Sequence, residues 1–262
     1  MVVEKMEKFK YIYGPVSSWR LGASLGIDLL SGKEKVCSFN CIYCQLGKKG
    51  TACINRKNYV PAGKVIEELK RLPDVHVDYY TFSGKGEPAL AKNIGKVASW
   101  IKKNKKGKTA LLTNSSTILD RRLWKDLKGM DLIAFKLDAY SEEVFKRINK
   151  PVRGINIENI RQSLLKFRKT FKGKFAVQIM VMKENLDEME DIKNFCKILK
   201  PDEIQLNTPL RPSGVQPADK KTMANVKKMF KELPVISAYE VKKKKIKPIS
   251  PKDTMKRRGK KL

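Results

Sequence analysis

The chain has 262 residues, enough for one large domain with a real core or for two small ones. Hydrophobic residues make up 41% of it, which suits a globular protein rather than a disordered one. The first 14 residues hold no apolar run that could serve as a signal peptide, and no stretch approaches the roughly 18 apolar residues of a membrane helix. We therefore expect a cytoplasmic protein with no membrane partner.

The charge is strongly unbalanced. There are 57 Lys and Arg against 27 Asp and Glu, a net charge of +30 at pH 7. This excess favours a polyanionic partner, with nucleic acid as the leading candidate, although a lysine-rich solvated surface is the simpler alternative. The single histidine, His76, makes histidine-based metal sites and histidine acid–base catalysis poor candidates.

Short β-type runs alternate with amphipathic helical stretches along the chain. In chain order, the predicted elements are strand 24–30, helix 61–72, strand 77–83, helix 92–104, strand 109–113, helix 119–127, strand 131–139, helices 141–149 and 156–171, strand 174–181, helix 187–199, strand 203–207 and helix 219–230. These six β/α units predict an α/β fold with a parallel sheet and right-handed crossovers, either an open doubly wound sheet or a barrel. No G-x-G-x-x-G follows the first strand, which argues against a dinucleotide-binding fold.

The last 21 residues differ in composition from the rest. Residues 242–262 are basic and hold little core-forming material. We expect a core domain over residues 1–241 and a basic C-terminal tail over residues 242–262.

Polar residues stand just after the predicted strands, where barrel active sites are built. In strand order they are the cysteines after strand one, GKGEP (84–88), TNSS (113–116), Lys136 with Asp138, Gln178, and QLNTP (205–209). The spacing of Lys136 and Asp138 puts both on one face. Most of these residues have a simpler alternative: a tight turn for GKGEP, a cap or turn for Asn114, a helix cap for Asp138, a surface position for Lys136, an ordinary loop position for Asn207 and Pro209, and a packing role for Tyr43.

Three cysteines, Cys37, Cys41 and Cys44, fall within eight positions in CSFNCIYC. In a reducing compartment such clusters are more often metal ligands than disulfides. An iron–sulfur cubane normally takes four thiolates, so three leave one iron open to another ligand. The alternative is a zinc site with Cys53 as the fourth ligand.

This C-x3-C-x2-C motif at the end of a first strand, with an aromatic before the last cysteine, resembles the radical S-adenosylmethionine family. The resemblance implies a partial (β/α)6 TIM-type barrel in which Cys37, Cys41 and Cys44 ligate a [4Fe–4S] cluster and S-adenosylmethionine chelates the open iron. It also implies a set of cofactor-binding residues: Tyr43, Gly84, Gly86, Glu87, Asn114, Asp138, Gln178 and Asn207. Within GKGEP, Lys85 stands where the family commonly has a small residue.

The activity implied is reductive cleavage of S-adenosylmethionine to a 5′-deoxyadenosyl radical that abstracts a substrate hydrogen, as in a radical oxidoreductase. The stretch GPVSSWRLGASLGIDL (14–29) and the motifs CIYCQLG, FSGKGEP, KLDA, INKPV and QLNTPLRP together resemble small iron–sulfur oxidoreductases related to the archaeal wyosine-type tRNA-modifying synthases. Those synthases carry a second cluster on upstream cysteines, and this chain has no cysteine before Cys37.

The resemblance implies a low-potential electron donor, a ferredoxin or flavodoxin, and allows an RNA or tRNA substrate. We expect a monomer. Two alternatives stay open: an activase of glycyl-radical enzymes that acts on a protein partner, and a non-enzymatic basic nucleic-acid-binding protein with a structural metal site.

Overall fold

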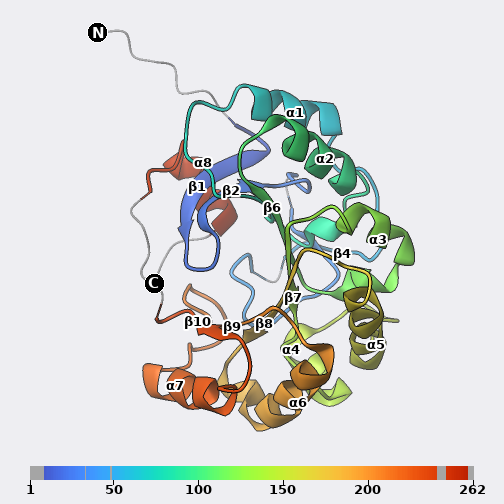
Figure 1. Cartoon of the computed structure of the whole chain (residues 1–262), viewed down its shortest axis with the longest axis vertical. Helices are drawn as coiled ribbons and strands as arrows, with labels where there is room; N and C mark the ends of the chain where they lie inside the picture. The colour runs from blue at the N-terminus through green and yellow to red at the C-terminus, as the bar shows by residue number, and fades with distance from the viewer. Residues whose placement is uncertain (1–8, 33, 48, 241–245, 259–262) are drawn as a thin grey trace.

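A computed structural model describes residues 9–32, 34–47, 49–240 and 246–258 (Figure 1). It contains a curled eight-stranded sheet in the order β1-β2-β5-β6-β7-β8-β9-β10. All neighbouring strands are parallel except β1 and β2, which form an antiparallel pair at one edge. The strands are β1 (Ile12–Ser18), β2 (Gly22–Ile27), β5 (Tyr79–Phe82), β6 (Lys108–Thr113), β7 (Leu132–Lys136), β8 (Lys174–Met180), β9 (Glu203–Asn207) and β10 (Val235–Ser237).

Seven helices connect the parallel strands and follow the outside of the curled sheet, from α1 at the top of Figure 1 to α7 at the bottom. They are α1 (Ala62–Lys70), α2 (Ile94–Asn104), α3 (Arg121–Leu127), α4 (Glu142–Asn149), α5 (Ile157–Arg168), α6 (Met189–Leu199) and α7 (Lys220–Met229). Three short 3-10 helices add to these: η1 (Pro88–Leu90), η2 (Ser116–Leu119) and η3 (Lys183–Glu188). The predicted half-barrel of β/α units is therefore confirmed, with each of the six predicted strands present.

The main core lies between the outer face of the sheet and the helices. Alternate strand residues such as Leu111, Ile133, Phe135 and Val177 point into it and are completely or almost completely buried. The intervening strand residues point to the inner face, where Ala110, Ala134 and Ala176 belong to a separate small hydrophobic cluster. Small side chains in the middle of the inner face keep this side of the half-barrel from filling with its own residues.

Four of the strands are not predicted from the sequence: β1, β10 and the two short strands of the cysteine segment. The edge strand β1 contains Pro15, which reads as a loop signal but is tolerated at a sheet edge because no ladder hydrogen bond is needed there. Strand β10 has three residues. The cysteine segment itself forms a two-stranded sheet of β3 (Val36–Cys37) and β4 (Thr51–Ala52), too short for any periodic signal.

The C-terminal segment packs back on the sheet edge. Helix α8 (Pro251–Arg258), which the sequence analysis does not predict, lies beside β1. Gly14 N donates to Thr254 Oγ1 (3.2 Å), and Ile249 N donates to Gly14 O (2.6 Å). The expected domain boundary at 241/242 lies outside the described residues, so that division stays a prediction. Within the described ranges, no helix combines the length and the apolar character needed to cross a bilayer.

Candidate active site at the carboxyl ends of the strands

The cysteine loop is anchored on the C-terminal end of α4. Helix ends leave carbonyl groups without intrahelical partners, and loop amides fill that role here. Asn40 N donates to Asn149 O (3.0 Å), and Ile42 N donates to Ile148 O (2.9 Å). Phe39 packs edge-to-face on Phe145 of α4, with ring centroids 5.3 Å apart. The three cysteines are thus held by a helix that follows β7, far along the chain.

Each of the three thiols has one side-chain N–H donor, and each donor comes from a different element. Asn114 Nδ2 lies 3.5 Å from Cys37 Sγ, Asn149 Nδ2 lies 3.5 Å from Cys41 Sγ, and Lys35 Nζ lies 3.9 Å from Cys44 Sγ. Donors directed at sulfur stabilise a thiolate over a thiol. The loop is therefore prepared for three ligands that carry negative charge.

Burial opposes that charge when no cation is bound. Desolvation, followed by the charges of Cys41 and Glu87, raises the pKa of the Cys37 thiol to about 12. Desolvation also raises the pKa of Cys41, partly offset by the charge of Lys136 and the hydrogen bonds from Tyr43 and Asn149. Such thiols become thiolates when a metal centre displaces their protons.

Cys53 stands apart from the other three cysteines. Its amide donates to Cys37 O (3.0 Å), but its sulfur lies 3.5 Å from both Tyr59 Oη and Asn55 O. Among the described residues, no three Cys, His, Asp or Glu side chains converge closely enough to hold a single ion. The Cys53 sulfur thus contacts oxygens of its own segment, whereas the other three thiols each face an N–H donor.

Lys35 is a buried cation inside the cysteine loop. It is 8% exposed, and its Nζ donates to Gly47 O (2.6 Å) and Asn40 Oδ1 (3.2 Å) as well as approaching Cys44. Its backbone carbonyl accepts from Thr51 N (2.7 Å). Lys35 therefore connects both ends of the cysteine loop by hydrogen bonds and places a positive charge beside the Cys44 thiol.

The GKGEP segment lies edge-on against β3. Val36 N donates to Lys85 O, and Glu87 N donates to Val36 O, both at 3.0 Å. Gly86 has φ +141°, and a Cβ there would lie 1.7 Å from Val36 O, so no other residue fits. The Lys85 ammonium turns away to Gly32 O (3.0 Å), which explains why a long side chain is accommodated at this position.

Glu87 is buried and accepts hydrogen bonds from three neighbouring segments of the site. It is 1% exposed; Oε1 accepts from Ala89 N (3.0 Å) and Thr113 Oγ1 (2.7 Å), and Oε2 accepts from Asn114 N (2.6 Å). Desolvation raises its pKa to about 7 despite these three bonds. The carboxylate joins η1, the end of β6 and the loop that carries Asn114.

Asn114 has two functions at once. Its Oδ1 accepts from Ser116 N (3.0 Å), the turn role expected of such an Asn, while its Nδ2 faces Cys37 and Ser38 Oγ (2.9 Å). Ser115 holds the turn in the left-handed region with φ +74°. The amide is thereby fixed with its N–H side toward the cysteine loop.

A buried polar network joins the loop to the end of β7. The Tyr43 hydroxyl donates to Asp138 Oδ2 and accepts from Lys136 Nζ (2.9 Å) and Asn149 Nδ2 (3.1 Å). Asp138 Oδ1 accepts from Met180 N (2.8 Å). Burial, followed by the charge of Asp138, raises the pKa of Tyr43 well above its usual value, so the hydroxyl stays protonated.

Two of the simpler alternatives for this network are wrong. The Lys136 side chain is 15% exposed and lies 3.4 Å from Asp138 Oδ2, so it is no surface lysine. Asp138 does not cap α4, because Ser141 Oγ accepts the hydrogen bond from Val144 N. The expected shared face of Lys136 and Asp138 is confirmed.

Gln178 and Asn207 stand on the inner face of the half-barrel. Gln178 lies in register between Lys136 and Gln205 on the neighbouring strands, and Asn207 ends β9 opposite Met180. Gln205 is completely buried; its Nε2 donates to Glu203 Oε1 (2.8 Å), while its Oε1 has no hydrogen-bond partner. A buried acceptor without a donor is costly, which makes Gln205 a candidate contact for a bound group.

All predicted site residues thus lie around one end of the sheet. The structure links Glu87 to Asn114 and the cysteines on one side, and Tyr43 to Asp138 on the other, while their roles stay predictions. The predicted cofactor-binding residues omit the sulfur donors Lys35 and Asn149, as well as Lys136 and Gln205, both of which belong to the polar groups at the predicted strand ends. Asn149 lies in the INKPV motif, but nothing local marks it or Lys35 as facing a cysteine.

The family model described as the radical SAM superfamily matches residues 35–196. The chain belongs to the radical SAM superfamily. As a radical SAM protein it is an enzyme, which sets aside the non-enzymatic alternative. The superfamily implies S-adenosylmethionine and a [4Fe–4S] cluster.

Several relatives of this radical SAM protein carry no named activity. The UPF0026 protein slr1464 of Synechocystis sp. is 39% identical over 79% of this chain and 78% of its own length. The UPF0026 protein MJ1312 of Methanocaldococcus jannaschii is 30% identical over 84% of this chain and 71% of its own. These relatives are consistent with the small oxidoreductase subgroup and do not name a substrate.

Solved structures show the same fold. Streptococcus suis SuiB bound to S-adenosylmethionine aligns with a TM-score of 0.61 at 16% identity, over 81% of this chain and 46% of that chain. Native anSMEcpe with bound AdoMet aligns with a TM-score of 0.59 at 17% identity, over 80% and 60%. The chain therefore spans roughly half the length of these structural neighbours, and the partial barrel is the part that they share.

Proposed function

We propose that Cys37, Cys41 and Cys44 hold a [4Fe–4S] cluster and that the enzyme cleaves S-adenosylmethionine reductively at this site. The observation that carries the proposal is the set of three thiols, each facing its own N–H donor, beside a glycine segment with no room for a side chain. The residues present fit the cluster, because hydrogen bonds to the sulfurs are among the levers that tune such clusters.

The surrounding residues provide a site for the cofactor. We assign backbone contacts with its methionine part to Gly84 and Gly86, whose positive φ values turn the segment toward β3. The polar side chains of the inner face and loop ends would hold the ribose, carboxylate and adenine; they are Tyr43, Asn114, Asp138, Gln178 and Asn207. For Glu87 the contribution is indirect, since its oxygens already accept three hydrogen bonds from the protein.

A cluster held by Cys37, Cys41 and Cys44 would supply the one-electron reduction that breaks the S–C5′ bond of S-adenosylmethionine into methionine and a 5′-deoxyadenosyl radical, which would take the substrate hydrogen. The protein's part is to orient the cofactor and to keep water out. Tyr43 and Asp138 are buried and the Lys136 side chain beside them is 15% exposed, so little of this network reaches water, which suits that purpose. The electron would come from a ferredoxin or flavodoxin that approaches the cysteine loop.

The test is uncoupled turnover. Protein reconstituted anaerobically with iron and sulfide, then reduced with dithionite, should release 5′-deoxyadenosine from S-adenosylmethionine without any substrate. Asn114→Ala should weaken cofactor binding about tenfold while most of the iron stays bound. The substitution removes the side-chain amide and its hydrogen bonds but none of the three thiols. Failure to release any 5′-deoxyadenosine from iron-loaded protein would contradict the proposed function.

For the substrate we propose an RNA, with a tRNA base as the site of hydrogen abstraction and the enzyme acting as a monomer. The net charge of +30 supports a polyanionic substrate. The glycyl-radical activase is the second candidate, and adding the cognate glycyl-radical enzyme or bulk tRNA to the uncoupled reaction separates the two. The productive partner should stimulate 5′-deoxyadenosine release.

Lys35→Met should lower the midpoint potential of the cluster. A buried ammonium beside Cys44 stabilises the reduced, more negative cluster, and methionine keeps the volume but removes the charge and the donor. We expect a shift on the order of 50–100 mV, measured by EPR-monitored redox titration. Lys85→Met, on the exposed side of GKGEP, is the control and should shift the potential far less; equal shifts would show that Lys35 has no special role.

A further inference from the structure

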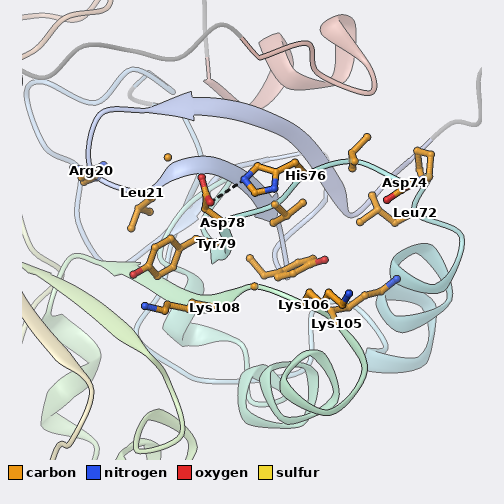
Figure 2. A pocket seen from close by; sticks show the side chains of 16 residues that line it. Arg20, Leu21, Leu72, Asp74, His76, Asp78, Tyr79, Lys105, Lys106 and Lys108 are labelled. Atoms are coloured by element: carbon orange, nitrogen blue, oxygen red, sulfur yellow. Dashed lines mark hydrogen bonds and ion pairs between the residues drawn. The ribbon is translucent and has the colours of Figure 1, made fainter.

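A cavity lies at the amino ends of the strands, away from the cysteines. It has a volume of about 1080 Å³ and opens between the β1–β2 turn, the segment before β5 and the turn between α2 and β6 (Figure 2). Its lining includes Arg20, Lys105, Lys106, Lys108 and Tyr79. We call it the basal pocket. Its volume exceeds the ~300–1,000 Å³ typical of small-molecule sites, so it has room for an extended ligand.

The lysine-rich turn of the basal pocket is a sequence feature that the proposed active site does not use. Residues 102–108 read KKNKKGK, five lysines in seven positions. Gly107 makes the turn possible, because it has φ +112° and a Cβ there would lie 2.6 Å from Val77 O. The turn therefore presses against the segment before β5 and brings Lys105, Lys106 and Lys108 to the mouth of the pocket.

No ion pair among the described residues neutralises the positive charges of Lys105, Lys106 and Lys108. Across the described residues, none of them has a carboxylate within ion-pair distance, whereas neighbouring Lys102 pairs with Asp131 (3.0 Å). Two carboxylates, Asp74 and Asp78, also line the pocket against four basic side chains, and Asp78 already accepts from Ala23 N (2.7 Å) and contacts His76 Nε2 (2.9 Å). The pocket thus presents a surplus of positive charge to a ligand.

Tyr79 adds an aromatic surface to this charge. It is the register partner of Lys108 on the neighbouring strand, so both side chains project from the same face of the sheet. Figure 2 shows the Tyr79 ring in the pocket between Asp78 and Lys108. The ring is half-buried, with the small inner-face cluster packed behind it. An aromatic face beside point charges is the combination that binds a base together with its phosphates.

The position of the basal pocket excludes two other uses. Strand β6 runs from Lys108 at the pocket to Thr113 beside Glu87, about 17 Å at roughly 3.3 Å per residue. The pocket is therefore no part of the proposed cofactor site. An electron donor must approach the cysteine loop, so donor docking does not account for lysines at the opposite end of the strands.

We propose that the basal pocket binds a single-stranded RNA segment, with phosphates on Lys105, Lys106 and Lys108 and one base stacked on Tyr79. This inference rests on the proposed function in taking RNA as the partner, and it adds a place where RNA is held outside the reaction site. Lysines bind phosphates as point charges, and stacking on an aromatic ring tolerates any base.

The test uses the full chain and a fluorescently labelled 15-nucleotide single-stranded RNA of mixed sequence, followed by anisotropy. The variant K105Q/K106Q/K108Q should bind roughly 10–50-fold more weakly near 150 mM salt. Its slope of log affinity against log salt should fall by about 2, since each phosphate contact contributes ~0.7. Tyr79→Leu, which keeps apolar packing, should weaken binding at least about fivefold without changing the slope.

The matched control is K220Q/K221Q/K228Q on α7. These three lysines are exposed and, like the pocket lysines, have no carboxylate within ion-pair distance in the part of the chain that the structure describes, although the pKa of Asp219 is lowered by hydrogen bonds from Thr222 and, to a smaller extent, by the charge of Lys221. Both triple variants carry the same net charge, so equal losses would overturn the proposal in favour of a general surface field. The proposal would also be overturned if Tyr79→Leu bound the single-stranded RNA as tightly as the wild type. Equal affinity of the wild type for duplex and single-stranded RNA would overturn it as well.

The experiment distinguishes failure of the proposed radical SAM function from failure of the proposed RNA site. Uncoupled 5′-deoxyadenosine release should be the same in the wild type and in both triple variants, because within the described residues none of the six lysines forms a hydrogen bond or ion pair with the cysteine loop or the proposed cofactor residues. Loss of RNA binding with unchanged release supports the basal pocket. Absence of release in the wild type would contradict the proposed function and leave the RNA measurement valid.

Discussion

Replacing Cys37, Cys41 or Cys44 by alanine should abolish the [4Fe–4S] cluster, while Cys53→Ala should leave it intact. Three thiols already leave one iron without a protein ligand, so losing another leaves too few to hold the cluster. Cys53 has its sulfur against Tyr59 and Asn55 instead. Reconstituted wild type and Cys53→Ala should each hold about four irons and four sulfides, measured by iron and sulfide analysis and by EPR after reduction.

A second control separates cluster loss from misfolding. Cys196 is buried in α6, within the main core and away from the loop. Cys196→Ala should reduce stability modestly, by about 1 kcal/mol for the lost packing, and should keep full iron content. Loss of the cluster in Cys53→Ala alone, or stoichiometric zinc in protein purified anaerobically, would refute the three-cysteine site.

Glu87→Ala should lower the free energy of unfolding by on the order of 3–5 kcal/mol. The substitution leaves Ala89 N, Thr113 Oγ1 and Asn114 N without their shared acceptor in a buried place. Because Asn114 then loses its fixed position, the affinity for S-adenosylmethionine should also fall, by about tenfold or more. Urea unfolding and equilibrium binding of the cofactor measure the two effects.

The chain offers a matched control in Glu68. This carboxylate is also buried, 4% exposed, and it accepts three backbone hydrogen bonds, from Lys10 N, Tyr11 N and Ile12 N. Glu68→Ala should therefore cost a similar amount of stability, yet leave the cofactor affinity unchanged because Glu68 lies on α1, facing β1. Equal loss of affinity in both variants would mean that Glu87 acts only through overall stability.

The fold follows from patterns that short sequence windows contain. Runs such as TALLT and KFAVQIMV specify buried parallel strands, and the amphipathic stretches between them specify helices, because both depend on local periodicity. The cysteine spacing and the glycines of GKGEP are local as well. They predict where the site lies, since the carboxyl ends of parallel strands meet at one edge of the sheet.

The tertiary structure alone decides which side chains meet there. Lys35 faces Cys44 because the loop folds back on itself, and Asn149 reaches Cys41 across 108 residues of sequence because α4 supports the loop. The basal pocket likewise depends on Tyr79 and Lys108 being register partners, a pairing set by long-range strand alignment. Periodicity determines which face a residue occupies, but contacts between distant segments depend on register and packing, which no short window contains.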